Sequence, residues 1–393
     1  MTDTFYLAWR YLAYHKIKTA ILVASIMLIV YLPVGLNVIV GQSAEELTAR
    51  ADTTPLLIGA KGSPLELVLN SLYFDSDPPE LTSYTDAVRV SDSGLAIPIP
   101  MYVRFRSREN PIVGTSLEYI EFRQLNLSSG RTMAVLGECV LGSRVAESLG
   151  VGVGGTVISS PESVFDLAGT YPLKMKVVGV LAPSFTADDE VIFVDLKTAW
   201  VIEGLVHGHQ DLAAPEAAAG VLKREGDTIV GNASVVQYNE ITPDNIDSFH
   251  FHGDLSEYPI SAIIAVPQDR KSGTILMGRY EGDEETSQIV QPTTVMNELL
   301  DTILTIQGFV VAAILLVAAA TLATAALVFM LSLRLRRREI ETMVKIGGSR
   351  LNISALLVSE VVVVLVLGVL LAGGLTLLTS QFGAGVIRAW LLS

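Results

Sequence analysis

Four of the five histidines occur as two closely spaced pairs, His207-Gly-His209 and His250-Phe-His252. Imidazole nitrogens are good ligands for Zn²⁺ and Cu²⁺, so the pairs would form a metal site if the fold brought them together. The H-x-H spacing by itself is common, and polar loop residues in an acidic region show the same pattern. We therefore favour the interpretation that these are loop residues, and we predict no metal site. If a metal does bind, these four histidines are the candidate ligands.

The second segment whose residue types suggest a function is the basic stretch RLRRREIETMVKIGGSRLNISALLVSE at residues 334–360. Apolar residues recur in it at helical spacing, namely Ile340, Met343, Val344 and Ile346, and two glycines then favour a helix end. A helix this short has no core of its own, so its apolar side must lie on lipid or on another protein. Because Glu339 and Glu341 interrupt the positive charge, we favour a protein partner.

The sequence has no motif for binding a nucleotide. The segment GECVLGS at 137–143 is the most similar to a G-x-x-x-x-G-K-[ST] loop, and it lacks the lysine. Cys139 is the only cysteine, which excludes an intramolecular disulfide framework. We therefore expect no catalytic residues and no cofactor on this chain, and we expect any ATP-Mg to be bound by a separate ATPase.

Composition indicates that these segments are positioned by membrane-spanning helices. Half of the 393 residues are hydrophobic and only 17% are charged, against about 25% charged in soluble proteins. The formal net charge of −14 leaves no basic surface for phosphates and argues against a nucleic-acid partner.

Three stretches are long and apolar enough to cross a hydrocarbon core of about 30 Å. They lie at residues 19–44, 301–333 and 351–378, and Glu360 is the only charge inside the third. The first apolar run is longer than that of a signal peptide, so we expect an uncleaved anchor. A glutamate in a span is costly, and we expect Glu360 to pair with a basic residue near the cytoplasmic edge.

Lysine and arginine residues indicate the orientation. They gather in residues 1–18, expected to be an amphipathic cytoplasmic segment, and in the loop 334–350. The acidic region 45–300 is then extracytoplasmic. The second span is too long for the bilayer core, and residues 293–301 are good helix formers that extend it. We favour a stalk reaching into the outer domain over a tilted helix.

The region 45–300 has the mixed pattern of an α+β domain. Residues 96–105, 174–181, 191–196 and 260–266 read as strands, and 143–150 reads as a short helix ended by Gly150. The segment 59–74 predicts an amphipathic helix, and we favour a core position over a surface that faces a partner.

Residues 379–393 are too short for a further span. We favour three spans followed by an interfacial segment, with a hairpin of two short spans turning at Gly373-Gly374 as the alternative. The predicted fold is an α-helical transmembrane bundle of three or four spans, with a large α+β extracytoplasmic domain inserted between spans 1 and 2.

Two segments carry a resemblance to a known family. The run GRTMAVLGECVLGSRVAESLGVGVGGTVISS at 130–160, followed by KMKVVGVLAPSFTADDEVIFVDLKTAW at 174–200, resembles the periplasmic core domain of MacB and FtsX-like permeases. The basic stretch is similar to the "R.REI..l..lG.sr" signature of FtsX-like permeases, with Met343 where leucine is usual. Gly155 replaces an acidic residue that is common in the family.

The resemblance implies that residues 334–350 hold the coupling helix, which docks on the ATPase subunit of an ABC transporter. The implied docking residues are Arg338, Glu339, Ile340, Met343, Ile346, Gly347, Ser349 and Arg350. It further implies a homodimer in the bacterial inner membrane, with a periplasmic adaptor or membrane-fusion protein as a further candidate partner beside membrane lipid.

The function that follows is that of a permease subunit for mechanotransmission and export, which expels or extracts a lipophilic or periplasmic substrate. The alternative is a non-transporting signal transmitter that activates a cell-wall hydrolase or a sensor. An ATP-independent receptor with a large ectodomain is the third interpretation, and it would need no coupling helix.

Overall fold

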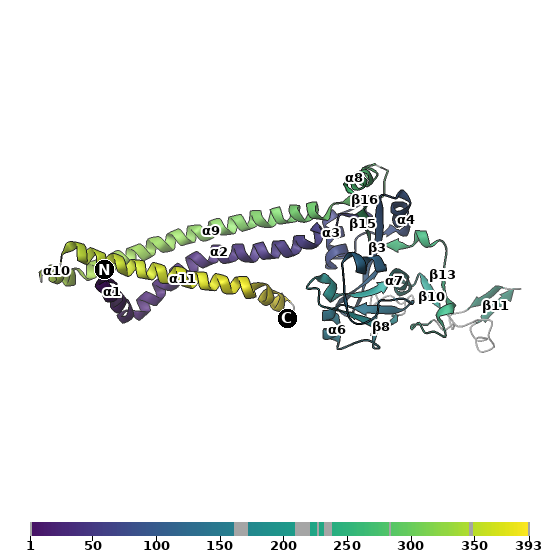
Figure 1. The fold of residues 1–393 in the computed structure, drawn as a ribbon, viewed down its shortest axis with the longest axis horizontal. Coiled ribbons are helices and arrows are strands. Elements are labelled where there is room, and N and C mark those ends of the chain that lie inside the picture. The colour runs from purple at the N-terminus through teal and green to yellow at the C-terminus, as the bar shows by residue number, and fades with distance from the viewer. Residues whose placement is uncertain are drawn as a thin grey trace. The chain divides into compact units, whose positions relative to one another are not determined.

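The computed structural model describes residues 2–160, 172–208, 221–225, 228–231, 238–282, 284–345 and 349–391 (Figure 1). The chain forms two compact units. The helical unit comprises residues 1–49 and 297–393, and the sheet unit comprises residues 50–296. Two helices, α2 and α9, have residues in both units.

Among the described residues, the helical unit contains three long apolar helices and two short ones. In chain order they are α1 (Thr2–Tyr14), α2 (Lys16–Asp52), α9 (Pro292–Leu335), α10 (Arg337–Lys345) and α11 (Arg350–Leu391). In the described part of the chain, α2, α9 and the stretch Ile353–Phe382 of α11 are long and apolar enough to cross a membrane. The three predicted apolar helices are therefore confirmed. The predicted helical extension of the second through residues 293–301 is confirmed too, because α9 begins at Pro292.

The structure decides against the hairpin alternative for the C-terminal segment. Helix α11 runs without a break from Arg350 to Leu391, so there is no turn at Gly373-Gly374. The favoured interpretation of three spans agrees with the three apolar helices, and the interfacial placement of residues 379–393 stays a prediction. A glycine inside a helix costs only about 1 kcal/mol relative to alanine, and strong helix formers flank this pair. Two adjacent glycines are therefore too weak to end a helix that is apolar on both sides.

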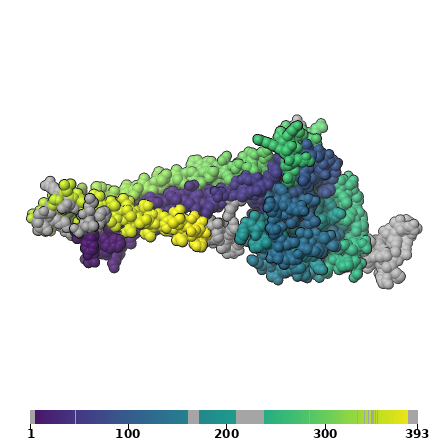
Figure 2. Space-filling view, in the orientation of Figure 1, coloured from purple at the N-terminus to yellow at the C-terminus, as the bar shows by residue number. Residues whose placement is uncertain are grey.

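Polar and close-packed contacts join α11 to α2 along the helical unit (Figure 2). Tyr31 Oη lies 2.9 Å from Thr379 Oγ1, and Gln42 Nε2 donates to the Ser380 carbonyl at 3.0 Å. A Cβ added at Gly368 would lie 2.6 Å from Ile26 Cγ2, so the backbone of α11 approaches α2 closely there. Gln307 on α9 donates to Asn37 on α2 at 3.2 Å.

The sheet unit is organised by one mixed sheet of ten strands. Along the sheet the strand order is β16-β1-β15-β3-β4-β9-β6-β8-β5, and β7 pairs with β8. The β4–β9 and β6–β8 pairs are parallel, whereas the other neighbours are antiparallel. The strands are β1 (Leu56–Ala60), β3 (Ala96–Ser107), β4 (Asn110–Thr115), β5 (Leu127–Gly130), β6 (Glu138–Leu141), β7 (Thr156–Ile158), β8 (Lys174–Leu181), β9 (Ile192–Asp195), β15 (Ala262–Pro267) and β16 (Ser287–Val290).

Short helices and three small two-stranded ribbons complete the described part of the sheet unit. The α-helices are α3 (Pro64–Val68), α4 (Tyr84–Ser93), α5 (Leu117–Phe122), α6 (Ser143–Leu149), α7 (Leu196–Glu203) and α8 (Arg270–Gly278). The ribbons pair β2 (Thr82–Ser83) with β14 (Pro259–Ile260), β10 (Val206–Gly208) with β13 (Phe249–Phe251), and β11 (Val221–Glu225) with β12 (Thr228–Gly231).

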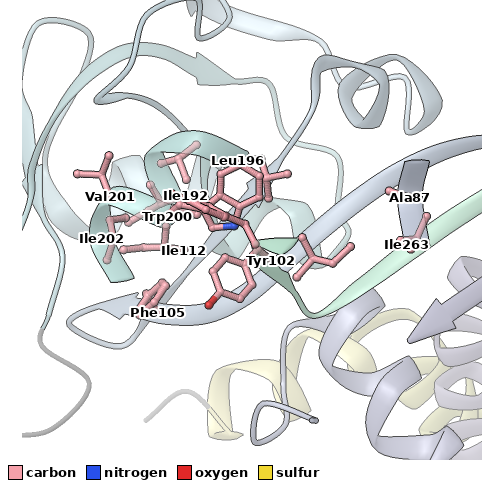
Figure 3. Packing of buried hydrophobic residues seen from close by; sticks show 14 of the residues in the cluster. Ala87, Tyr102, Phe105, Ile112, Ile192, Leu196, Trp200, Val201, Ile202 and Ile263 are labelled. Atoms are coloured by element: carbon pink, nitrogen blue, oxygen red, sulfur yellow. The ribbon is translucent and has the colours of Figure 1, made fainter. Parts of the chain in front are cut away.

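One part of the core lies between the sheet and α7 (Figure 3), and residues of α4, α6 and α8 also belong to the core cluster. Trp200 of α7 is buried, packs edge-on against Tyr258 at 4.9 Å between ring centroids, and donates its indole N–H to the Pro259 carbonyl at 2.8 Å. Gly114 of β4 allows α7 to lie directly on the strand, because a Cβ there would meet the Ala199 Cβ at 2.5 Å.

Most local predictions for this unit are confirmed. The predicted strands correspond to β3, β8, β9 and β14–β15, and the predicted helix at 143–150 is α6, ended by Gly150 at φ +63°. The segment 59–74 forms α3 and a following π-turn, with Leu67, Val68 and Leu72 buried. It is therefore part of the core, as favoured.

Candidate functional site

The short amphipathic helix predicted within residues 334–350 is present as α10, and a one-residue break separates it from the long helix α9. Helix α9 ends at Leu335, Arg336 forms a turn, and α10 runs from Arg337 to Lys345. The Arg337 Nε donates to Glu341 Oε1 at 3.1 Å one turn later, and both side chains are exposed. An exposed pair of this kind adds only a few tenths of a kcal/mol, so tertiary contacts must hold α10 in place.

The implied docking residues fall on α10 and on the start of α11. Arg338 is exposed and Ile340 is half-buried on α10, which also carries Glu339 and Met343. Ser349 is exposed, and its carbonyl accepts from the Ile353 N–H at 3.2 Å, while Arg350 begins α11. Ile346 and Gly347 lie outside the described residues, and so does Gly348.

Arg336 joins three helices at this end of the helical unit. Its Nη1 lies 3.2 and 3.3 Å from the two carboxylate oxygens of Glu360 on α11. The guanidinium carbon also lies 3.9 Å from the ring centroid of Tyr11 on α1. The side chains of Arg336 and Glu360 are only 14% and 5% exposed. This buried pair lies directly beside the break between α9 and α10, and so connects that break to α1 and α11.

Sequence reasoning left Arg336 out of the candidate site. Six basic residues lie between the second and third apolar stretches, and nothing in their spacing distinguishes the one that meets Glu360. The useful signal was Glu360 itself, because a carboxylate in a span requires a cationic partner.

A second buried polar network lies in the sheet unit, at the last turn of α2. Arg50 donates from Nη1 to Asp188 Oδ2 at 2.6 Å and from Nη2 to Asp188 Oδ1 at 2.8 Å. The Tyr119 hydroxyl donates to Asp188 Oδ1 at 2.7 Å and accepts from Arg50 Nη2 at 2.6 Å. All three residues are buried. The two-point pairing fixes the direction of the guanidinium as well as its distance.

The electrostatics of this network favour the ionised pair. Burial of the Asp188 carboxyl opposes ionisation, but the attraction and hydrogen bonds of Arg50 outweigh it and hold the pKa of Asp188 below its usual range. Burial raises the pKa of the Tyr119 phenol, so this residue stays a neutral donor. The network is therefore a charged pair locked by a neutral hydroxyl, and nothing in the sequence marked it.

The structure brings three of the candidate histidines together. His207 of β10 lies opposite His250 of β13, and ring nitrogens of His207, His250 and His252 all lie within 4.8 Å of one another. His209 lies outside the described residues. His207 and His250 lie on paired strands, so the loop interpretation is wrong for these two, whereas His252 follows directly after the end of β13. The sequence does not show the register in which β10 and β13 pair.

A short exposed helix follows a long helix at one end of the helical unit. A buried ion pair holds the last turn of α2 within the sheet unit. Residues 20–237, more than half of the chain, match the family model of the MacB-like periplasmic core domain.

The chain belongs to this family. It is therefore an ABC-type transporter permease that carries a MacB-like extracytoplasmic domain together with membrane-competent helices. The comparison with curated proteins gives no match.

The comparison with solved structures gives matches to two extracytoplasmic regions. One is the periplasmic region of MacB from Actinobacillus actinomycetemcomitans, at 13% identity and a TM-score of 0.35, covering 66% of this chain and 98% of that one. The other is the extracellular domain of the noncanonic ABC-type transporter YknZ from Gram-positive bacteria, at 13% identity and a TM-score of 0.33, covering 60% of this chain and 98% of that one.

Proposed function

We propose that this chain is the permease subunit of an ABC-type mechanotransmission complex in the bacterial inner membrane. A separate cytoplasmic ATPase binds and hydrolyses ATP-Mg, and two copies of the permease form a dimer within the membrane. Movement of the extracytoplasmic domain then expels or extracts a lipophilic or periplasmic substrate. An adaptor or membrane-fusion protein on the outer side is a further partner in this proposal.

The observation that carries the proposal is the break at Arg336. A nine-residue amphipathic helix follows a 44-residue helix after a single turn residue. Nine residues cannot nucleate and hold a helix alone in water. Helix α10 is therefore kept in place by Arg336 and its contacts to Glu360 and Tyr11 and by a protein that covers its apolar side. An ATPase subunit is that protein in this proposal.

Two continuous helices supply the route for transmission. Helices α2 and α9 each contain residues of both units, and the last turn of α2 carries the Arg50–Asp188 pair. The first residues of α9 directly follow β16, an edge strand of the large sheet, and Met296 is fully buried. A displacement of either helix along its axis is therefore passed to the sheet unit, because an unbroken helix resists compression.

The test is to place a charge on the apolar side of α10. The full chain is purified from its native host with an affinity tag, and co-purifying ABC ATPases are identified and quantified by mass spectrometry. Ile340→Asp should remove most of the ATPase, because a carboxylate cannot be desolvated in an apolar socket without a partner. Thr342→Asp adds the same charge to the exposed opposite face of α10 and should retain the ATPase.

The same preparation distinguishes transport from signalling. In nanodiscs, ATP hydrolysis that rises with a lipophilic substrate and falls with Ile340→Asp supports export. A cell-wall hydrolase bound to the complex, without substrate-stimulated hydrolysis, would favour the signal-transmitter alternative. Equal recovery of every ATPase with the wild type and Ile340→Asp would overturn the docking role of α10, and with it the proposal.

A further inference from the structure

The three clustered histidines lie on one face of the β10–β13 ribbon. Strand β13 reads Phe249-His250-Phe251, and His252 follows it directly. Phe249 is buried and Phe251 packs against the core, so alternation along the strand places His250 on the opposite face. The His252 ring lies beside the other two imidazoles, 4.7 Å from His250 and 5.0 Å from His207 between centroids. His207 is the direct cross-strand neighbour of His250. The core therefore sets the side on which all three imidazoles gather.

We propose that His207, His250 and His252 form a Zn²⁺ site on the extracytoplasmic domain. Their ring centroids are 4.9, 5.0 and 4.7 Å apart, and one ligand nitrogen from each lies within 4.8 Å of the others. Tetrahedral zinc with Zn–N bonds of about 2.0–2.1 Å holds its nitrogens about 3.3 Å apart. Small side-chain rotations close that difference, and the exposed His252 has room to make them.

A hydrogen bond from the ring of His250 orients this ligand, as is usual for histidines that bind metals. The Ser248 carbonyl lies 3.0 Å from His250 Nδ1, and since a carbonyl only accepts, Nδ1 must carry the proton. In the neutral ring this tautomer puts the lone pair on Nε2, which is the usual arrangement in a metal-binding histidine.

The backbone of His252 is held by Tyr258. The His252 N–H donates to the Tyr258 hydroxyl at 2.9 Å, and that hydroxyl donates back to the His252 carbonyl at 2.9 Å. Tyr258 is buried and packs on Trp200 in the core. The backbone of the exposed ligand is therefore anchored to the buried core of the sheet unit.

The ligand chemistry favours zinc over the lighter divalent cations. Three imidazoles are poor ligands for Mg²⁺ and Ca²⁺, which prefer oxygen, and they suit a borderline ion such as Zn²⁺. Three protein ligands leave a fourth tetrahedral position for water or for an incoming donor. The ion would clamp β10 to β13 and offer an exchangeable coordination position on the outer face of the domain. This inference does not depend on the proposed function.

The experiment measures zinc on the full chain in detergent, purified with a tag that contains no histidine. After treatment with a chelator and dialysis against micromolar free Zn²⁺, elemental analysis should find about one zinc per chain. Competition with a chromophoric chelator then gives the affinity. His207→Gln and His252→Gln should each weaken binding on the order of 100-fold or more, since even second-shell losses cost 10–100-fold.

The remaining described histidine provides a matched control. His15 lies in the turn between α1 and α2, between the rings of Tyr11 and Tyr14, so His15→Gln should retain full zinc affinity. Thermal midpoints without metal should agree between wild type and His252→Gln, and zinc should raise only the wild-type midpoint. Replacement by Co²⁺ should give the intense visible absorption of a four-coordinate ion.

Three results would overturn the site. The first is the absence of zinc uptake by the wild type under these conditions. The second is an equal zinc affinity in His252→Gln. The third is a loss of affinity in His15→Gln as large as that in the two ribbon variants, which would show that zinc binds elsewhere.

Discussion

At the scale of single residues, the Arg50–Asp188 pair is a buried ion pair at the last turn of α2. Its two charges are 7% and 2% exposed, and Tyr119 closes the network. Forming such a pair gains little net free energy, because desolvation offsets the attraction. Removing one partner is different, since it leaves the other charge buried and uncompensated. The pair therefore specifies one arrangement of the last turn of α2 rather than adding much stability.

Asp188→Asn should destabilise the sheet unit by about 3–5 kcal/mol, because the guanidinium of Arg50 then stays buried without a counter-charge. Glu190→Gln is the matched control, since Glu190 lies in the same short turn and its pair with Arg144 is exposed. It should cost about 0–1 kcal/mol. Thermal unfolding of the full chain, followed by tryptophan fluorescence, measures both, and equal midpoints would contradict the burial argument.

The same pair predicts how stability depends on pH. The pKa of Asp188 is lowered in the folded protein, so its contribution is complete above the unfolded-state pKa of about 3.9. That contribution is lost as the pH falls through the lowered folded-state pKa. Below about pH 4 the wild-type midpoint should therefore fall more steeply than that of Asp188→Asn. If plots of unfolding midpoint against pH were parallel for the wild type and Asp188→Asn, Asp188 would not be ionised in the folded state.

At the scale of elements, α11 depends on close contact with α2. Gly368 is the position where the two backbones approach, whereas a Cβ at Gly373 would meet nothing within 4 Å. In lipid, helices associate mainly through such packing, because the hydrophobic effect does not favour helix contact over lipid contact. Gly368 therefore has a structural role in α11, whereas Gly373 is dispensable.

Gly368→Ala should loosen the α2–α11 contact by about 1–3 kcal/mol, the usual cost of overpacking. Gly373→Ala should be neutral or stabilising, because alanine is the better helix former by up to about 1 kcal/mol. Thermal aggregation of the detergent-solubilised chain compares them. Ile26→Ala should restore much of the thermal stability that Gly368→Ala loses, because it makes room for the added methyl group. Failure of this rescue would count against the contact between the two helices.

At the scale of the whole molecule, the distribution of charge determines which side of the membrane each part faces. Basic residues flank the apolar helices at residues 1–18 and 334–350, whereas the sheet unit contains most of the acidic residues. Short basic loops are retained in the cytoplasm. Helix α10 and the sheet unit should therefore lie on opposite sides of the membrane.

The single cysteine makes this topology easy to test. Cys139 is fully buried, and burial raises the pKa of its thiol to about 12, so the wild type should not react with a membrane-impermeant maleimide. Glu147→Cys, on an exposed position of α6, should be labelled in intact spheroplasts. Arg338→Cys on α10 should be labelled only after the membrane is opened. The reverse pattern would invert the topology.

Local patterns in the sequence were enough to predict most elements. Hydrophobic runs predicted α2, α9 and α11, and alternation and turn residues predicted β3, β8 and α6, because each pattern reports the burial of neighbouring residues. Helical periodicity and the basic cluster also predicted α10. Where local signals were weak, as at Gly373-Gly374, the sequence left two alternatives open. The structure excludes the hairpin alternative, since a glycine pair costs less than a helix gains from its apolar surroundings.

The sequence by itself determined what kind of protein this is: three apolar helices, a mixed domain inserted after the first, and a basic amphipathic helix between the other two. Only the tertiary structure decided which charges and imidazoles meet. Asp188 lies 138 residues after Arg50, Glu360 lies 24 after Arg336, and His207 meets His250 through strand pairing. Periodicity records which side of an element is buried, but the partner across the core depends on register and packing, which no single stretch of sequence contains.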